Sequence, residues 1–280
     1  MPSMTTGAAL GLALLYSLFD IAQARAQAPA AADIQNPQIE IAYRKPSNPA
    51  FQPIYDRLTR LKVLEQFKQF TAPLRLPRKL AVTVDQCGTT TRPYRPQGPV
   101  TVCYELIEQI ERVAAKAEKG AQERLIVGTF VQVVLHETAH AVFDILQVPV
   151  WGRDEDAADN LAAFIMLQFG DDLALQTIQG TASFFQLSEK TWTGSDFADV
   201  RSPDPQRYFN HLCMAYGSDK TTFEFLVKAD EGKEPMLPKR RAVRCEREYE
   251  TFRKFFNMRI MPYVDPDLLT TVRSMQWVTR

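Results

Sequence analysis

The feature that most constrains this chain is the motif His136-Glu137-x-x-His140, which follows an apolar stretch. Residues 125–135 are strongly apolar and contain no proline, a pattern that predicts a buried helix. Residues four apart share a helix face, so His136 and His140 would present two imidazoles to one Zn²⁺. Glu137 would point to the side, where a carboxylate can take the proton of a metal-bound water. The motif therefore predicts a zinc site with Glu137 as the general base.

The motif is informative because the chain has only three histidines, and two of them stand in this frame. A short motif remains a hypothesis until its structural context agrees, so an ordinary helix with two hydrogen-bonded histidines is the alternative. Two titratable groups in an apolar helix need partners, and a metal ion is one way to supply them.

A turn should separate this helix from a second one. The first helix is expected to stop near Gln147, because Pro149 disfavours helical backbone in the residue before it. Asp154 is a suitable N-cap for a second helix, and Gly170 marks its expected end. Catalytic zinc commonly takes three protein ligands, so the third is expected from this second helix.

Glu155 and Asp159 stand four positions apart on the second helix and therefore share a face. This pair resembles the second signature of gluzincin metallopeptidases. In those enzymes a Glu is the third zinc ligand, and an Asp one turn later orients a ligating histidine. The resemblance implies these two roles for Glu155 and Asp159, with Asp156 as the alternative ligand. Acids in a first helical turn also favour the positive end of the helix dipole, which is the structural alternative.

The wider sequence resembles a family of uncharacterised bacterial zinc metallopeptidases that is catalogued only as a domain of unknown function. The resemblance runs from about residue 52 to about residue 256. Besides the two metal-site motifs, it rests on the segments Cys87-Gly88, Cys103-Tyr104-Glu105-Leu106, Tyr208-Phe209-Asn210-x-Leu212-Cys213-x-x-Tyr216-Gly217 and Leu237-Pro238-x-x-Arg241-Ala242-x-x-Cys245-x-x-Glu248-Tyr249. It implies a peptidase acting on a peptide or protein, without identifying the substrate.

The remaining pattern predicts an α+β fold that is mostly helical. Runs at 39–43, 80–84 and 100–104 predict short strands, and helical spacing covers 55–70. Two strands, then a helix at 105–119, then the motif helix is the order of the N-terminal half of a zincin. In that fold an edge strand pairs with an extended peptide substrate. Residues 100–104 are the candidate edge strand, and an interior strand is the alternative.

The chain after the second site helix is expected to be helical. The pattern predicts helices at 172–187, from Asp204 to Gly217, and a long charged helix from Pro238. A loop at 191–202 could line the cleft.

A hydrolase of this class needs a hydrogen-bond donor to the oxygen that gains charge in the transition state. His211, Tyr208 and Tyr216 are the candidates, and all lie on the helix expected from Asp204. His211 also fits a structural role, and the sequence leaves the choice open.

The N-terminus predicts export. Residues 7–19 are a short apolar run followed by small residues, which is typical of a signal peptide at 1–26 cleaved after Ala26. No Lys or Arg precedes the run, so an uncleaved membrane tether is the alternative. A linker at 27–50 and a zincin-like metallopeptidase domain at 51–280 would follow. Within that domain, the edge strand and the motif helix would lie before about residue 150 of the chain, and the helical part would follow.

The chain has four cysteines, an even number that suits disulfides in a periplasmic or secreted protein. Cys87 and Cys103 bracket a loop rich in Pro, Gly and Thr, so we expect them to pair. Cys213 and Cys245 lie on two expected C-terminal helices, so we expect a second disulfide between them. Four reduced thiols in a cytosolic protein are the alternative.

Charge excludes some partners. Lys plus Arg and Asp plus Glu each number 33, so no basic field argues for nucleic acid. No stretch after the signal peptide predicts a membrane span. The sequence thus predicts a zinc-dependent metallopeptidase with a peptide or protein substrate. The alternative is an exported zincin-like binding or structural module without catalysis, and the oligomeric state stays open.

Overall fold

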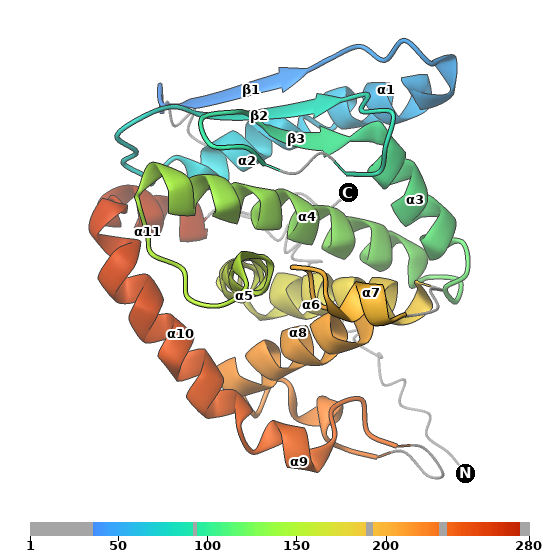
Figure 1. The fold of residues 1–280 in the computed structure, drawn as a ribbon, viewed down its shortest axis with the longest axis vertical. Helices are drawn as coiled ribbons and strands as arrows, with labels where there is room; N and C mark the ends of the chain where they lie inside the picture. The colour runs from blue at the N-terminus through green and yellow to red at the C-terminus, as the bar shows by residue number, and fades with distance from the viewer. Residues whose placement is uncertain (1–35, 92–93, 189–192, 230–233, 275–280) are drawn as a thin grey trace, which may run out of the picture. The chain divides into compact units, whose positions relative to one another are not determined.

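The structure is a computed structural model that describes residues 36–91, 94–188, 193–229 and 234–274 (Figure 1). The expected signal peptide at 1–26 and the first part of the expected linker lie outside these residues. The described chain is α+β and mostly helical, with a small sheet at its N-terminal side, as the sequence predicts.

Three strands form a parallel sheet in the order β1-β2-β3. They are β1 (Ile39–Tyr43), β2 (Leu80–Asp85) and β3 (Val100–Cys103), close to the predicted positions. Ile39 stands opposite Leu80, and Val82 opposite Val100. β1 lies inside the 27–50 stretch and pairs with β2. Because β3 pairs only with β2 in the described chain, it forms an edge of the sheet.

Parallel neighbours need a crossover connection, and two helices supply it between β1 and β2. They are α1 (Gln52–Arg60) and α2 (Val63–Thr71), preceded by a 3-10 turn at Pro49–Phe51. The prediction of one helix at 55–70 is therefore wrong. Lys62 breaks it by adopting left-handed backbone with a φ of 52°.

The motif helix α4 (Gln122–Ile145) lies between the sheet and the helices α5 (Asp154–Met166) and α6 (Asp171–Leu187) (Figure 1). It follows α3 (Tyr104–Ala114), which ends earlier than the expected 105–119. α4 is the one described helix long and apolar enough to cross a membrane. Most of its most apolar window (61%) is buried inside the fold, as expected of a core helix.

A residue with positive φ follows α4, whereas α5 ends at Met166 with Leu167 still in right-handed helical backbone. Gln147 has a φ of 51° just after α4, where the sequence predicts the stop. α5 begins at Asp154 with Arg153 in the N-cap position, so the prediction of Asp154 as N-cap is off by one residue. Gly170, with a φ of 88°, precedes α6 rather than closing α5. The acidic residues therefore occupy the first turns of α5.

Two glycines let α4 and α6 approach closely. A Cβ at Gly128 would lie 2.5 Å from the Thr177 carbonyl oxygen, and one at Gly180 would overlap the Arg124 carbonyl oxygen. Thr181 Oγ1 donates a hydrogen bond to the Gly128 carbonyl at 3.0 Å. This contact fixes the first half of α4 against the helical side of the fold.

The C-terminal half is helical. Its helices are α7 (Gly194–Phe197), α8 (Asp204–Ser218), α9 (Lys239–Ala242), α10 (Cys245–Arg259) and α11 (Pro266–Ser274), with 3-10 turns at Glu224–Leu226 and Met261–Tyr263. The prediction of one long charged helix from Pro238 is wrong, because the chain turns between α9 and α10.

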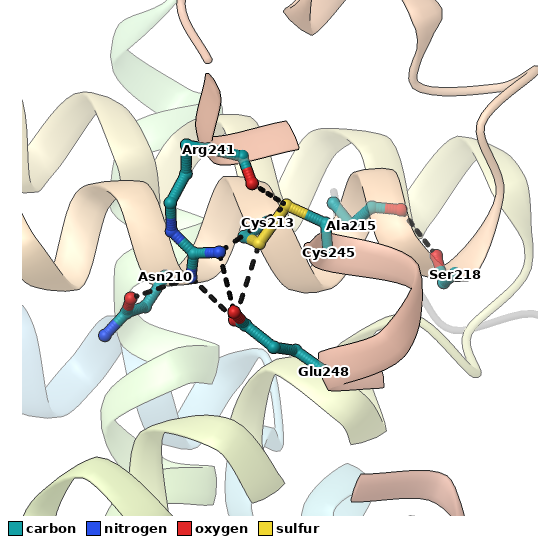
Figure 2. The surroundings of a disulfide bond; sticks show 7 residues. All are labelled: Asn210, Cys213, Ala215, Ser218, Arg241, Cys245 and Glu248. Carbon is teal, nitrogen blue, oxygen red and sulfur yellow. Dashed lines mark hydrogen bonds and ion pairs between the residues drawn. A yellow bond between two sulfur atoms is a disulfide. The ribbon is translucent and has the colours of Figure 1, made fainter. Parts of the chain in front are cut away.

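Both expected disulfides are present, Cys87–Cys103 and Cys213–Cys245. The second joins α8 to α10, and Figure 2 shows its surroundings. Arg241 of α9 donates hydrogen bonds to the Glu248 carboxylate at 2.9 and 2.7 Å and to Asn210 Oδ1 at 3.3 Å. The covalent bond and this arginine together hold α8, α9 and α10 to one another.

Candidate metal centre

His136 and His140 of α4 meet Glu155 of α5 in one cluster. Each offers a ligand atom, and the three atoms all lie within 4.8 Å of one another. The two Nε2 atoms are 3.3 Å apart. Glu155 places Oε2 3.1 Å from His136 Nε2 and Oε1 3.6 Å from His140 Nε2. Asp156, the alternative ligand, is not part of this cluster.

The cluster has the geometry of a metal site. Imidazole nitrogens lie about 2.0–2.1 Å from tetrahedral zinc, so two of them are about 3.3 Å apart across a tetrahedral angle. The separation of the two Nε2 atoms agrees with this value. His136 is buried, while His140 and Glu155 are only partly buried, so the cluster is not sealed from solvent. Two imidazoles and one carboxylate could therefore hold a metal ion.

A second cluster of ligand-type residues contains Cys87, Cys103 and Glu105. Its two cysteines form a disulfide, so they offer no thiolate to a metal. Glu105 instead accepts hydrogen bonds from the backbone amides of Cys87 at 3.0 Å and Gly88 at 2.7 Å. This carboxylate closes the loop beside the disulfide, and a structural role accounts for it.

Asp159 orients His136 from behind. Its Oδ1 lies 2.8 Å from His136 Nδ1, so that nitrogen carries a proton and Nε2 faces the ligand cluster. The same carboxylate accepts hydrogen bonds from Gln132 at 2.8 Å and from Arg207 at 2.7 and 2.9 Å. Burial raises the pKa of Asp159, but the charge of Arg207 outweighs it and holds the pKa well below its usual range. Asp159 is therefore ionised.

The two side chains that support Asp159 were not singled out in the sequence. Gln132 stands four residues before His136 on the same helix, so helical spacing could have placed it beside the motif. Arg207 comes from α8, with no local pattern that links it to α5. A buried carboxylate needs a counter-charge, but sequence alone does not say which arginine supplies it.

Arg201 also belongs to the site and was not predicted. Its Nη2 lies 2.7 Å from Glu155 Oε2 and 3.4 Å from His136 Nε2. It is partly buried and comes from the stretch at 191–202, which was expected to be a loop lining the cleft and which contains the short helix α7. Burial raises the pKa of Glu155, but the hydrogen bond with His136 and the charge of Arg201 lower it to about 2. Glu155 is thus ionised at neutral pH.

Glu137 is not one of the three clustered ligand-type residues; it lines a cavity of about 60 Å³ that His136 also lines. Thr101 of β3, Leu106 of α3, Phe185 of α6 and Arg201 line the same cavity. Burial raises the pKa of the Glu137 carboxyl above its ordinary value. A carboxylate whose pKa is raised toward neutrality is suited to accept a proton and return it.

His211, Tyr208 and Tyr216, the expected oxyanion donors, are not among the described residues that line this cavity. All three lie on α8. His211 is buried with Nδ1 3.0 Å from the Arg207 carbonyl oxygen, and its ring packs against Phe185. This placement suits the structural role of His211 that the sequence left open.

The fold and site together define a helical α+β protein with a candidate His-His-Glu metal site next to a buried glutamate. The chain belongs to the family DUF4344, described as "Putative metallopeptidase", whose model matches residues 43–258. This confirms the family resemblance seen in the sequence. No curated protein and no solved structure matches the chain.

Proposed function

We propose that this chain is a zinc-dependent metallopeptidase that hydrolyses a peptide or protein through a metal-activated water. His136, His140 and Glu155 are the ligands in this proposal. Zinc bound there would lower the pKa of its water and polarise the scissile carbonyl. The single observation that carries the proposal is the spacing of the three ligand atoms. The family description supports it.

Glu137 is the general base: it accepts the proton of the attacking water and delivers it to the leaving amine. Asp159 positions His136 and keeps its Nε2 free for the ligand cluster. We assign to Arg201 the role of hydrogen-bond donor to the substrate carbonyl oxygen, in preference to His211, Tyr208 and Tyr216. Arg201 lies beside two ligands and lines the same cavity as Glu137.

The proposed fold is zincin-like, and the catalytic domain takes in β1 as well as the expected residues 51–280, because β1 is part of the sheet. The edge strand β3 would pair with an extended peptide. Thr101 of this strand lines the cavity beside Glu137, so a substrate side chain would enter that cavity. Removal of a signal peptide at 1–26 would leave a periplasmic or secreted enzyme. The two disulfides support this location, since such bonds persist in oxidising compartments.

The variant Glu137→Gln tests the mechanism, because it keeps the size of the side chain and removes the base. We expect the metal content to stay at the wild-type level and peptide hydrolysis to fall at least about 100-fold. Metal analysis and digestion of a peptide library, each with and without a chelator, measure the two quantities. Glu123→Gln is the matched control, because Glu123 is exposed at the start of the same helix.

Undiminished hydrolysis by the Glu137→Gln variant would rule out this mechanism. A wild-type protein that holds zinc but shows no chelator-sensitive cleavage would favour the other candidate, an exported zincin-like binding or structural module.

A further inference from the structure

A second cavity of about 320 Å³ borders a different face of α4. This volume lies in the range of small-molecule pockets, roughly 300–1,000 Å³. Leu135, Thr138 and Val142 line it, and their spacing places them on one side of the helix. His136 and His140 carry the metal ligands on another side. The cavity is therefore separate from the candidate metal centre.

Backbone hydrogen bonds hold the walls of this cavity. Leu74, which follows α2, pairs with Val264, which precedes α11, in an isolated antiparallel bridge. The Arg75 amide donates to the Tyr263 carbonyl at 2.7 Å beside it. Leu74 and Val264 both line the cavity. Segments far apart in the sequence are thus joined by backbone hydrogen bonds along one wall of the cavity.

The lining combines an apolar interior with arginines. Phe164 and Phe256 are among its several aromatic residues, and no Asp or Glu is among the described lining residues. Arg253 and Arg273 are the charged residues of the lining, and both are exposed. Arg253 is already paired with Glu250 at 2.6 Å.

Of these two arginines, Arg273 has no partner carboxylate within the described chain. It donates a hydrogen bond to the neutral Gln168 Oε1 at 3.2 Å. A largely apolar cavity beside a guanidinium that no described carboxylate pairs complements a ligand with a hydrocarbon tail and an anionic head. A carboxylate matches the planar fork of arginine especially well.

We propose that this cavity binds a linear alkyl carboxylate, with its tail among the aromatic residues and its carboxylate on Arg273. A water molecule takes roughly 30 Å³ and a methylene group is of similar size, so the cavity would accommodate about ten carbon atoms. An empty apolar cavity forfeits packing contacts, and the alkyl chain restores them. The site goes beyond the proposed peptidase function and does not depend on it.

Calorimetric titration of the full chain at pH 8 with decanoate, decanol and acetate tests this proposal. We expect about one decanoate per chain, decanol bound about tenfold more weakly, and no binding of acetate, because both tail and head contribute. Arg273→Gln should weaken decanoate about tenfold and leave decanol unchanged. Arg259→Gln, an exposed arginine of α10 outside the cavity, is the matched control and should change neither.

Leu269→Trp, which adds bulk to the cavity wall, should abolish binding of both long-chain ligands, with circular dichroism and melting as checks of folding. His140→Ala should leave decanoate binding intact, which separates this site from the metal cluster. The proposal would be overturned by no decanoate binding, by equal binding of decanoate and decanol that Arg273→Gln does not change, or by loss of binding in His140→Ala. Binding that appears only after removal of residues 275–280 would also overturn it, because the tail would then be the occupant.

Discussion

Asp159 shows how one buried residue can control a site it does not join. Its carboxylate contacts His136, Gln132 and Arg207, and all four side chains are buried. The Arg207 guanidinium and two further donors satisfy the charge of Asp159. Through His136, this network determines which imidazole nitrogen faces Glu155.

The variant Arg207→Met should destabilise the fold, because it leaves Asp159 buried without its counter-charge. Breaking one side of a buried ion pair costs about 3–5 kcal/mol. We expect the free energy of unfolding, measured by urea titration, to fall by about 3 kcal/mol. Arg247→Met on the exposed surface of α10 is the control, with an expected change within about 0.5 kcal/mol. A similar small change for both variants would show that Arg207 does not hold Asp159.

At the scale of single residues, the sequence predicts the cluster well where helical spacing carries the information. His136 and His140 share a four-residue spacing on α4, and Glu155 and Asp159 share one on α5, while the roles of the second pair came from the gluzincin resemblance. Arg201 could not be predicted, because a loop distant in the chain delivers it to the cluster. The preference for Glu155 over Asp156 as the third ligand came from the resemblance to gluzincins. The structure places only Glu155 in the cluster.

Among the elements, α4 and α6 pack closely against each other beside the site. Gly128 and Gly180 stand where the two backbones approach, and a side chain at either would meet backbone atoms. Backbone cannot swing aside as a flexible side chain does, so one helix must shift. Because His136 lies two turns after Gly128, a shift of α4 would reach the cluster.

Gly180→Ala should therefore destabilise the protein even though alanine is the better helix former by about 1 kcal/mol. Overpacking typically costs about 1–3 kcal/mol. Because the added Cβ would overlap the Arg124 carbonyl oxygen, we take the upper part of that range, about 2–3 kcal/mol, which leaves a net loss of about 1–2 kcal/mol in the free energy of unfolding. Gly194→Ala is the matched control, because nothing lies within 4 Å of a Cβ there, and it should be neutral or slightly stabilising. A Gly180→Ala variant as stable as wild type would mean that the helices are not packed so closely.

Element positions could be predicted better than element breaks. The three strands and α6 lie close to where the sequence predicts them, because alternation and helical spacing continue through each. The break at Lys62 could not be predicted, since left-handed backbone at a lysine leaves no mark in the apolar pattern. The turn between α9 and α10 also leaves no mark in the apolar pattern. The parallel direction of the strands depends on the whole chain path and was not predicted.

On the scale of the whole molecule, the site depends on contacts distant in the sequence. α4 and α5 carry the three candidate ligands, the segment before α8 provides Arg201, and α8 provides Arg207. The Cys213–Cys245 disulfide fixes α8 to α10, so the covalent framework supports the helix that neutralises Asp159. The same core helix, α4, borders both the candidate metal centre and the apolar cavity.

The central claim is that two adjacent helices bring His136, His140 and Glu155 to one metal ion. Its most direct test is the zinc content of the purified wild-type chain beside Glu155→Ala and Asp156→Ala variants, each dialysed against the same zinc buffer. We predict about one zinc ion per chain in the wild type and in Asp156→Ala, and a large loss in Glu155→Ala, because only Glu155 lies in the cluster. Zinc retained by Glu155→Ala and lost by Asp156→Ala, or zinc absent from the wild type, would contradict the claim.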